Sequence, residues 1–276
     1  MVIIHDGHVH SPYCPHGSKD SLHKYCEAAI ENQIQGITFA EHAPLPPSFV
    51  DPTPQKDSAM SRAFLEDYIK EVQAIKQFYK GKLNVYLGLE IDFIEGFEKE
   101  ISDFLNEVGP VLDDSILSVH FLKVASDYLC IDYSPEVFGD AIVRLGSVEA
   151  VYKLYYDTVA KSIETDLGPF HPKRIGHITL ARKFHKKFPI SSPFTDETLD
   201  ILKKIKKKGY ELDYNGAGCI KPLCREPYPS NVIIDQAISL DIPLVYGSDA
   251  HQASSLLSGY QQLSPNASLK KPQILL

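Results

Sequence analysis

Four histidines and one aspartate fall within the thirteen residues HDGHVHSPYCPHG, 5–17. Side chains two residues apart point the same way in an extended strand, so His8 and His10 can bind one ion while Val9 faces the other side. His16 follows in the loop and can reach a neighbouring ion. Imidazoles combined with carboxylates suit zinc, manganese or iron and disfavour calcium. The stretch therefore predicts a transition-metal site.

Metal-binding side chains recur at the ends of other apolar, strand-like runs. Asp249 and His251 repeat the spacing of two, with Ala250 between them facing away. The carboxyl ends of the strands of a βα barrel converge on one face, where the active sites of that fold lie. A single histidine at a strand end is more often structural than a ligand, but nine candidates at the ends of six strands indicate a metal centre. The nine are His8, His10, His16, His42, Glu90, His120, His177, Asp249 and His251.

The elements that must position these residues are strands alternating with helices along the whole chain. Such alternation predicts an α/β fold with a parallel sheet covered by helices, and seven units favour a closed or nearly closed barrel. The expected strands are residues 1–10, 36–42, 83–91, 115–121, 174–179, 209–215 and 242–251. The expected helices are residues 20–33, 62–80, 96–108, 147–166, 195–208 and 230–240.

No linker or change in composition divides the chain, so residues 1–276 are expected to form a single domain. The Pro-rich stretch 43–58 predicts a long loop over the mouth of the barrel. Residues from about 270 to 276 are expected to form a loosely held tail. The helix 195–208 has Thr195 as its expected N-cap and Gly209 as its expected C-cap.

Composition and charge exclude several classes of protein. A net charge of −8 argues against a general nucleic-acid binder, which needs clustered Lys and Arg. The basic run KKIKKKG, 203–209, is interpreted as the solvated end of a helix. The chain starts without a secretory signal and has no run of 18 apolar residues, so a cytoplasmic protein without a membrane partner is expected. Five scattered cysteines with no CxxC pair fit reduced thiols.

The ordered motifs HVH, EH, GLEI, SVH, GH and GSDAH resemble the polymerase and histidinol phosphatase (PHP) superfamily along almost the whole chain. Within it, HVHSPYCPHG, ITFAEHAPLP, LGLEIDF, SVHFL, IGHITLARKF and KPLCREPYPS look like the monofunctional histidinol-phosphate phosphatases. The resemblance implies a distorted (β/α)7 barrel holding three divalent ions, Zn, Mn or Fe, at the carboxyl ends of the strands. The first ion would be held by His8, His10, Glu90 and Asp249, the second by Glu90, His120 and His177, and the third by His16, His42 and His251.

The activity that the resemblance implies is hydrolysis of L-histidinol phosphate to L-histidinol and phosphate in histidine biosynthesis. We expect the nucleophile to be a hydroxide bridging the two ions that share Glu90. Asp249 can orient this water and exchange a proton with the departing alcohol, whereas His251 is a weaker proton donor because metal would occupy its lone pair. Glu41, beside His42, is expected on the opposite side of its strand as a supporting or core residue.

The substrate contacts are less defined. Arg182 is the leading phosphate ligand because its guanidinium can bind two phosphate oxygens. Lys221 and Arg225 are weaker candidates; many family members have an Arg where this chain has Ile220. The amine and imidazole of the substrate are expected to meet acids or aromatics in the mouth of the barrel. The candidates are Tyr13, Asp92, Phe93, Tyr214 and Asn215.

Three alternatives stay open at this point. A PHP-type protein-tyrosine phosphatase or a phosphodiesterase would share the same metal core. A nuclease would need a basic track, and a protein phosphatase an open mouth, whereas the loop 43–58 predicts a partly covered one. A metal-binding module without catalysis is less favoured, because all nine ligand positions are filled. The sequence leaves the oligomeric state undetermined.

Overall fold

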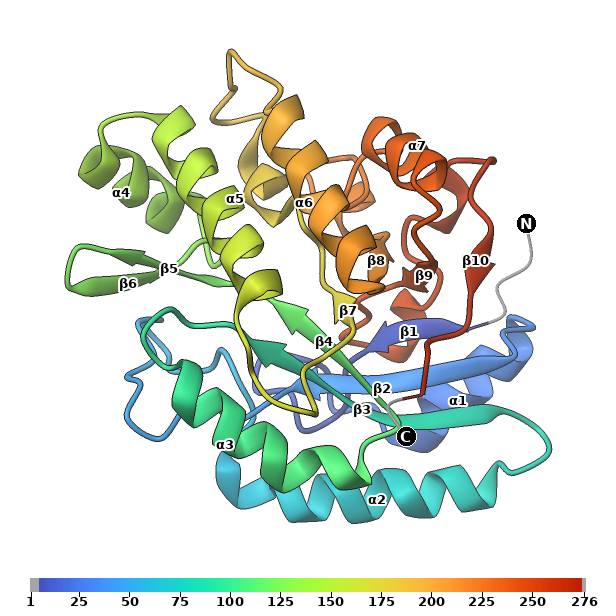
Figure 1. The fold of residues 1–276 in the computed structure, drawn as a ribbon. Coiled ribbons are helices and arrows are strands. Elements are labelled where there is room, and N and C mark those ends of the chain that lie inside the picture. Colours follow the sequence, from blue (N-terminus) through green and yellow to red (C-terminus); the bar gives the residue numbers. More distant parts are fainter. Residues whose placement is uncertain (1–4, 275–276) are drawn as a thin grey trace.

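The structure is a computed structural model that describes residues 5–274, and its centre is a closed barrel of parallel strands (Figure 1). Neighbouring strands pair in chain order, and pairing of Asp6 with Tyr246 joins the first strand to the last and closes the barrel. The predicted seven-stranded α/β barrel is confirmed. Its strands are β1 (Asp6–Val9), β2 (Gly36–His42), β3 (Asn84–Asp92), β4 (Asp114–Ser118), β7 (Arg174–Ile175), β8 (Glu211–Asn215) and β9 (Leu244–Gly247).

Helices pack around the outside of the barrel (Figure 1). On α2, Leu65, Tyr68, Val72 and Ile75 are buried along one face, the pattern of an amphipathic helix that packs on a core. The hydroxyl of Tyr68 lies 2.8 Å from the Phe39 carbonyl oxygen and thereby ties the helix to β2. The helices are α1 (Leu22–Glu31), α2 (Leu65–Phe78), α3 (Glu98–Val108), α4 (Pro135–Leu145), α5 (Val148–Glu164), α6 (Thr195–Lys208) and α7 (Asn231–Ser239).

Two elements were not predicted. An antiparallel hairpin, β5 (Phe121–Val124) and β6 (Asp127–Cys130), follows β4, and α4 follows the hairpin. The expected strand 115–121 therefore ends at Ser118, before His120. Short strands of four residues carry too little periodicity to be recognised from sequence.

The fifth expected strand, 174–179, is reduced to Arg174–Ile175, which accounts for the distortion of the barrel. A Cβ added to Gly176 would lie 2.1 Å from the Ser118 Oγ, so the chain needs glycine where it passes β4. His177 consequently lies in the loop after the strand and not within it.

The expected caps of α6 are half correct. Thr195 is the first residue of the helix, and its N-cap is Phe194, which has the left-handed conformation and makes no side-chain cap. The Thr195 assignment is therefore wrong. Gly209 ends the helix with φ 69°, as expected for a residue that must adopt the left-handed conformation.

The segment expected to be a loose tail begins inside a paired strand. β10 (Leu269–Lys270) pairs in parallel with Leu244 and Val245 of β9. The next residue of β9, Tyr246, pairs with Asp6. The Gln273 backbone N–H lies 3.2 Å from both carboxylate oxygens of Glu211. These contacts attach the tail to β9 and β8. Residues 275–276, and residues 1–4 of the first expected strand, lie outside the described residues.

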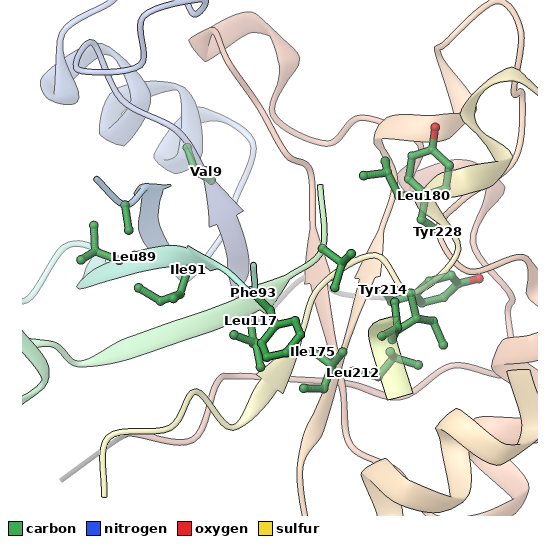
Figure 2. Packing of buried hydrophobic residues seen from close by; sticks show 14 of the residues in the cluster. Val9, Leu89, Ile91, Phe93, Leu117, Ile175, Leu180, Leu212, Tyr214 and Tyr228 are labelled. Carbon is green, nitrogen blue, oxygen red and sulfur yellow. The ribbon is translucent and has the colours of Figure 1, made fainter. Parts of the chain in front are cut away.

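Apolar side chains from the strands and loops fill the space around the barrel (Figure 2). Val9, Leu89, Leu117 and Leu212 are fully or almost fully buried. Burial of apolar surface contributes roughly 25 cal/mol per Å², so this packing fixes the strand ends that carry the polar residues. Within residues 5–274, none of the helices is long and apolar enough for a membrane crossing.

Candidate metal centre

The nine expected ligands converge at the carboxyl ends of the barrel strands. A cavity of about 550 Å³ opens there, and the fully buried His8 and His10 contact two of its lining residues, Glu90 and Asp249. His8 lies on β1 and His10 directly follows its last residue, Val9; residues two apart in extended chain point to the same side. The other seven line the cavity: His16, His42, Glu90, His120, His177, Asp249 and His251.

Three of the expected first-ion ligands form one compact group. Ligand atoms of His8, His10 and Asp249 all lie within 4.8 Å of one another. His10 Nε2 is 3.2 Å from Asp249 Oδ1, and His8 Nε2 is 3.3 Å from Glu90 Oε2. This spacing matches donors that share one ion.

Glu90 also belongs to a second group with His120 and His177. Its Oε1 is 2.9 Å from His177 Nε2 and 3.8 Å from His120 Nε2. Since the other oxygen faces His8, the two oxygens of one carboxylate reach two different groups. Glu90 is therefore placed where a bridging ligand would lie.

The third group is looser. His16 Nε2 and His251 Nε2 are 3.1 Å apart, while His42 Nδ1 lies 3.0 Å from Glu90 Oε2. His42 thus reaches the Glu90 oxygen that faces His8, and it also lies within 4.8 Å of ligand atoms of His120 and of His251. The buried Cys14 sulfur also comes within reach of His42 and His251, a contact that the sequence did not predict. Burial raises the pKa of the Cys14 thiol, which keeps it protonated.

The electrostatics of the cavity favour ionised carboxylates. Burial alone would raise the pKa of Glu90, but the surrounding charges, led by His8 and His120, hold it well below its usual value. Burial likewise opposes ionisation of Asp249, and His8 and His10 hold its pKa well below normal. Both carboxylates are therefore available as anionic ligands at neutral pH.

The histidines divide into two sets. Burial and the neighbouring His10 hold the pKa of His251 well below its usual value, so its imidazole is neutral and its nitrogen can bind a metal. Burial also lowers the pKa of His16. Burial opposes the charge on His10 too, but the hydrogen bonds to Asp249 and Glu41 raise its pKa to about 9. The carboxylates around His10 thus stabilise positive charge at this position.

A second set of carboxylates orients the histidines from behind. Asp213 Oδ2 is 3.0 Å from His8 Nδ1, and Glu41 Oε1 is 3.3 Å from His10 Nδ1. Such carboxylate–histidine pairs fix the ring so that its other nitrogen faces the ion. Asp92 does the same for His120, at 2.7 Å. Glu41 was expected as a supporting residue. Period two could have identified Asp92, which follows Glu90 on one strand face.

Unpaired buried atoms test whether the residues present fit a metal. His8 Nε2, His42 Nδ1 and Glu90 Oε2 have no hydrogen-bond partner within residues 5–274. Leaving such atoms unsatisfied costs about 1–3 kcal/mol each, whereas coordination to cations would satisfy them. The imidazole and carboxylate donors fit divalent transition metals. The site is built to bind divalent metal ions.

The PHP domain family matches residues 6–217, which are most of the chain. This chain belongs to the PHP family. It is 50% identical to histidinol-phosphatase from Bacillus subtilis (strain 168) over 258 residues, which cover 93% of this chain and 96% of that enzyme. The family resemblance expected from the motifs is confirmed.

Solved structures agree with the barrel of this PHP protein. A candidate histidinol phosphatase from Listeria monocytogenes is 37% identical, with a TM-score of 0.90 over 94% of this chain and 100% of that one. Histidinol phosphate phosphatase from Lactococcus lactis subsp. lactis is 18% identical, with a TM-score of 0.72 over 99% of both chains. The second similarity concerns the fold; that crystal structure contains zinc, L-histidinol and phosphate.

The expected phosphate ligands of this PHP protein fall in different places. Lys221 lines the cavity, but neither Arg182 nor Arg225 does. The Arg182 guanidinium pairs instead with Glu226. Lys183, the next residue, does line the cavity. The two residues lie on a 3-10 helix, Leu180–Phe184, in which successive side chains point about 120° apart, so only one of them can face the metals.

The hairpin and the loop after it form a wall of the cavity that the sequence did not predict. Phe121 and Cys130 of the hairpin, and Asp132 and Tyr133 after it, line the cavity. Asp57 and Ser58 line it from the long loop 43–58. Among the five residues expected to meet the amine and imidazole of the substrate, Asp92 alone is part of the lining.

Proposed function

We propose that this PHP protein hydrolyses L-histidinol phosphate to L-histidinol and phosphate, as a step of histidine biosynthesis. One observation carries the proposal: half of the residues are identical to a histidinol-phosphatase over nearly the full length of both chains. The converging donor groups are consistent with it, because a phosphate monoester hydrolyses very slowly unless its charge is neutralised.

We propose three divalent ions, Zn, Mn or Fe, held by the ligand sets that the resemblance implies. The two compact donor groups, which share Glu90, support the first two ions, and the 3.1 Å contact between His16 and His251 supports the third. When bound, such ions lower the pKa of a coordinated water and offset the charge of phosphoryl oxygens.

Asp249 is the proposed acid and base. Its Oδ1 lies by His10, whereas its Oδ2 accepts a hydrogen bond from Asn215 Nδ2 at 3.2 Å. A carboxylate held in this way can take a proton from water and return it to the leaving alcohol. His251 is disfavoured as proton donor because its Nδ1 lies 3.0 Å from the Asp249 carbonyl oxygen, which leaves Nε2 for metal.

Phosphate contact is proposed for Lys183 and Lys221 ahead of Arg182 and Arg225. The two lysines line the cavity, and 21% of the Lys183 side chain is exposed. The Arg182 guanidinium pairs with Glu226, and neither residue lines the cavity. A lysine ammonium neutralises a phosphate oxygen as a point charge.

Steady-state kinetics on three substrates test the proposal. We expect kcat/KM of the metal-loaded protein to be at least about 100-fold higher for L-histidinol phosphate than for phosphotyrosine or a bis-aryl phosphodiester. Comparable values for all three would contradict the proposed substrate. Anomalous scattering at the iron, manganese and zinc edges from an untreated crystal would identify the metals, with one peak expected in each donor group.

A further inference from the structure

Asp132 is a carboxylate of the cavity that holds no metal-binding histidine. It follows β6 and lies two residues before Ser134, the N-cap of α4, so elements on both sides hold it in place. It lines the cavity, and 19% of its side chain is exposed. Burial alone would raise the pKa of Asp132, but the charges of Lys183 and His120 lower it, so the group is an anion.

One oxygen of this carboxylate remains available to a ligand. Oδ2 accepts a hydrogen bond from Lys183 Nζ at 2.8 Å. Among the described residues, Oδ1 faces one donor, the thiol of Cys130 at 3.4 Å. A thiol is a weak donor, so Oδ1 has unused capacity to accept hydrogen bonds from a charged group.

The other carboxylates of the cavity are less suitable for this purpose. Glu90 and Asp249 face the histidines of the metal groups, and Asp92 accepts from His120. Asp57 comes from the long loop, and its backbone carbonyl accepts from His16. Asp132 is thus the anion of the inner wall that is free to receive a cation from the substrate.

We propose that Asp132 Oδ1 binds the protonated amine of the substrate while Lys183 contacts its phosphate. This inference rests on the proposed function. In L-histidinol phosphate the amine-bearing carbon adjoins the carbon of the phosphate ester, so the ammonium and the phosphoryl group are separated by two carbon atoms and the ester oxygen. The adjacent Lys183 and Asp132 present the opposite charges at a similarly short separation. Asp132 therefore selects phosphate monoesters of 2-amino alcohols.

The test compares Asp132→Asn with the wild type on two substrates. One is L-histidinol phosphate and the other is 3-(imidazol-4-yl)propyl phosphate, which lacks the amine. We expect kcat/KM of the variant to fall about 10- to 100-fold on the first, because a charge-assisted hydrogen bond is lost, and less than about 3-fold on the second. The wild type should prefer the amine-bearing substrate by a similar factor.

Two further variants isolate the effect. Asp127→Asn removes a carboxylate from the same hairpin that pairs with Arg144 outside the cavity, so it should leave both substrates unchanged. Asp132→Ser keeps a hydroxyl that can accept from Lys183; it should show the same selective loss, and it replaces Asp132→Asn if that variant fails to fold. Metal content is measured for each variant.

Three outcomes would overturn the inference. Equal losses on both substrates would mean that Asp132 acts only by holding Lys183 or the metals. A selective loss in Asp57→Asn and not in the Asp132 variants would move the amine to the long loop. A wild type that hydrolyses L-histidinol phosphate no faster than phosphotyrosine would refute the proposed function itself. Because this measurement uses only the wild type, it separates failure of the proposed function from failure of the Asp132 inference.

Discussion

The two ends of the barrel bury charge in opposite ways. At the amino ends of the strands, burial raises the pKa of Asp6 to about 7, of Asp114 to about 6 and of Glu211 to about 7. At the carboxyl ends, the surrounding histidines hold the pKa of Glu90 and Asp249 well below normal despite burial. We call these regions the lower end and the metal end.

The lower end supplies its own cation. Arg174 is buried, and its Nη2 donates to Asp114 at 2.6 Å and to the Gly7 carbonyl at 2.8 Å. A Cβ on Gly7 would lie 1.9 Å from Arg174 Nη1, so glycine makes room for the guanidinium. The metal end groups carboxylates with imidazoles and holds no Lys or Arg ion pair to Glu90 or Asp249 among the described residues. Both ends leave some buried polar atoms without a hydrogen-bond partner among the described residues. Buried charge at the lower end is thus compensated by Arg174 within the fold, whereas the carboxylates of the metal end can be compensated by bound metal ions.

The largest expected effect comes from Glu90→Gln at the metal end. Because both carboxylate oxygens face donor groups, the variant should lose two of the three proposed ions and lower kcat by at least about 10³-fold. Elemental analysis and steady-state kinetics measure both effects. Glu107→Gln, on the surface, is the matched control. Unchanged metal content in Glu90→Gln would show that the residue does not bridge.

Arg174→Met should destabilise the fold through the lower end and leave the metal content of the metal end unchanged. It leaves Asp114 buried beside no cation, which costs about 3–5 kcal/mol of unfolding free energy. Urea unfolding measures the loss. The double variant with Asp114→Asn should recover part of it, while metal content per folded molecule stays as in the wild type. Loss of metal in the folded variant would mean that the two ends are not independent.

Asp213→Asn tests whether the carboxylates behind the histidines matter. It removes the acceptor that orients His8, so metal affinity should fall about 10- to 100-fold, while the fold is retained. Chelator competition measures the affinity. Asp92→Asn, behind His120, should weaken a different ion by a similar factor. If both variants retained wild-type affinity, the histidines would be oriented by packing alone.

The smallest effect concerns pH and the lower end. The acid pKa values there are raised from 3.8 or 4.5 in the unfolded chain to about 6 or 7, so the folded state binds more protons between these limits. Stability should therefore fall as pH rises from about 4 to about 7. Glu211→Gln should make this fall shallower, as measured by urea unfolding at several pH values. An unchanged slope would show that Glu211 stays ionised.

Much of the metal end could be predicted, because ligand chemistry and strand spacing are local properties. The pairs His8 and His10, and Asp249 and His251, share a side through the period of two in extended chain. The repeated βα pattern then places strand ends on one face. The reduced β7 and the hairpin could not be predicted, since their segments are too short for periodicity to emerge.

The sequence by itself determined which residue types would meet and at which end of the barrel. Only the tertiary structure decided which side chains form the cavity wall that we propose contacts the substrate. Whether Arg182 or Lys183 faces the cavity depends on the rotation of a short 3-10 helix, and Arg182 is drawn to Glu226, 44 residues away along the chain. Asp132 reaches the cavity because the hairpin pairs Phe121 with Cys130, two residues of the cavity lining, and so returns the chain to the barrel mouth just before Asp132. Side-chain direction in loops is set by distant contacts, which no local pattern encodes.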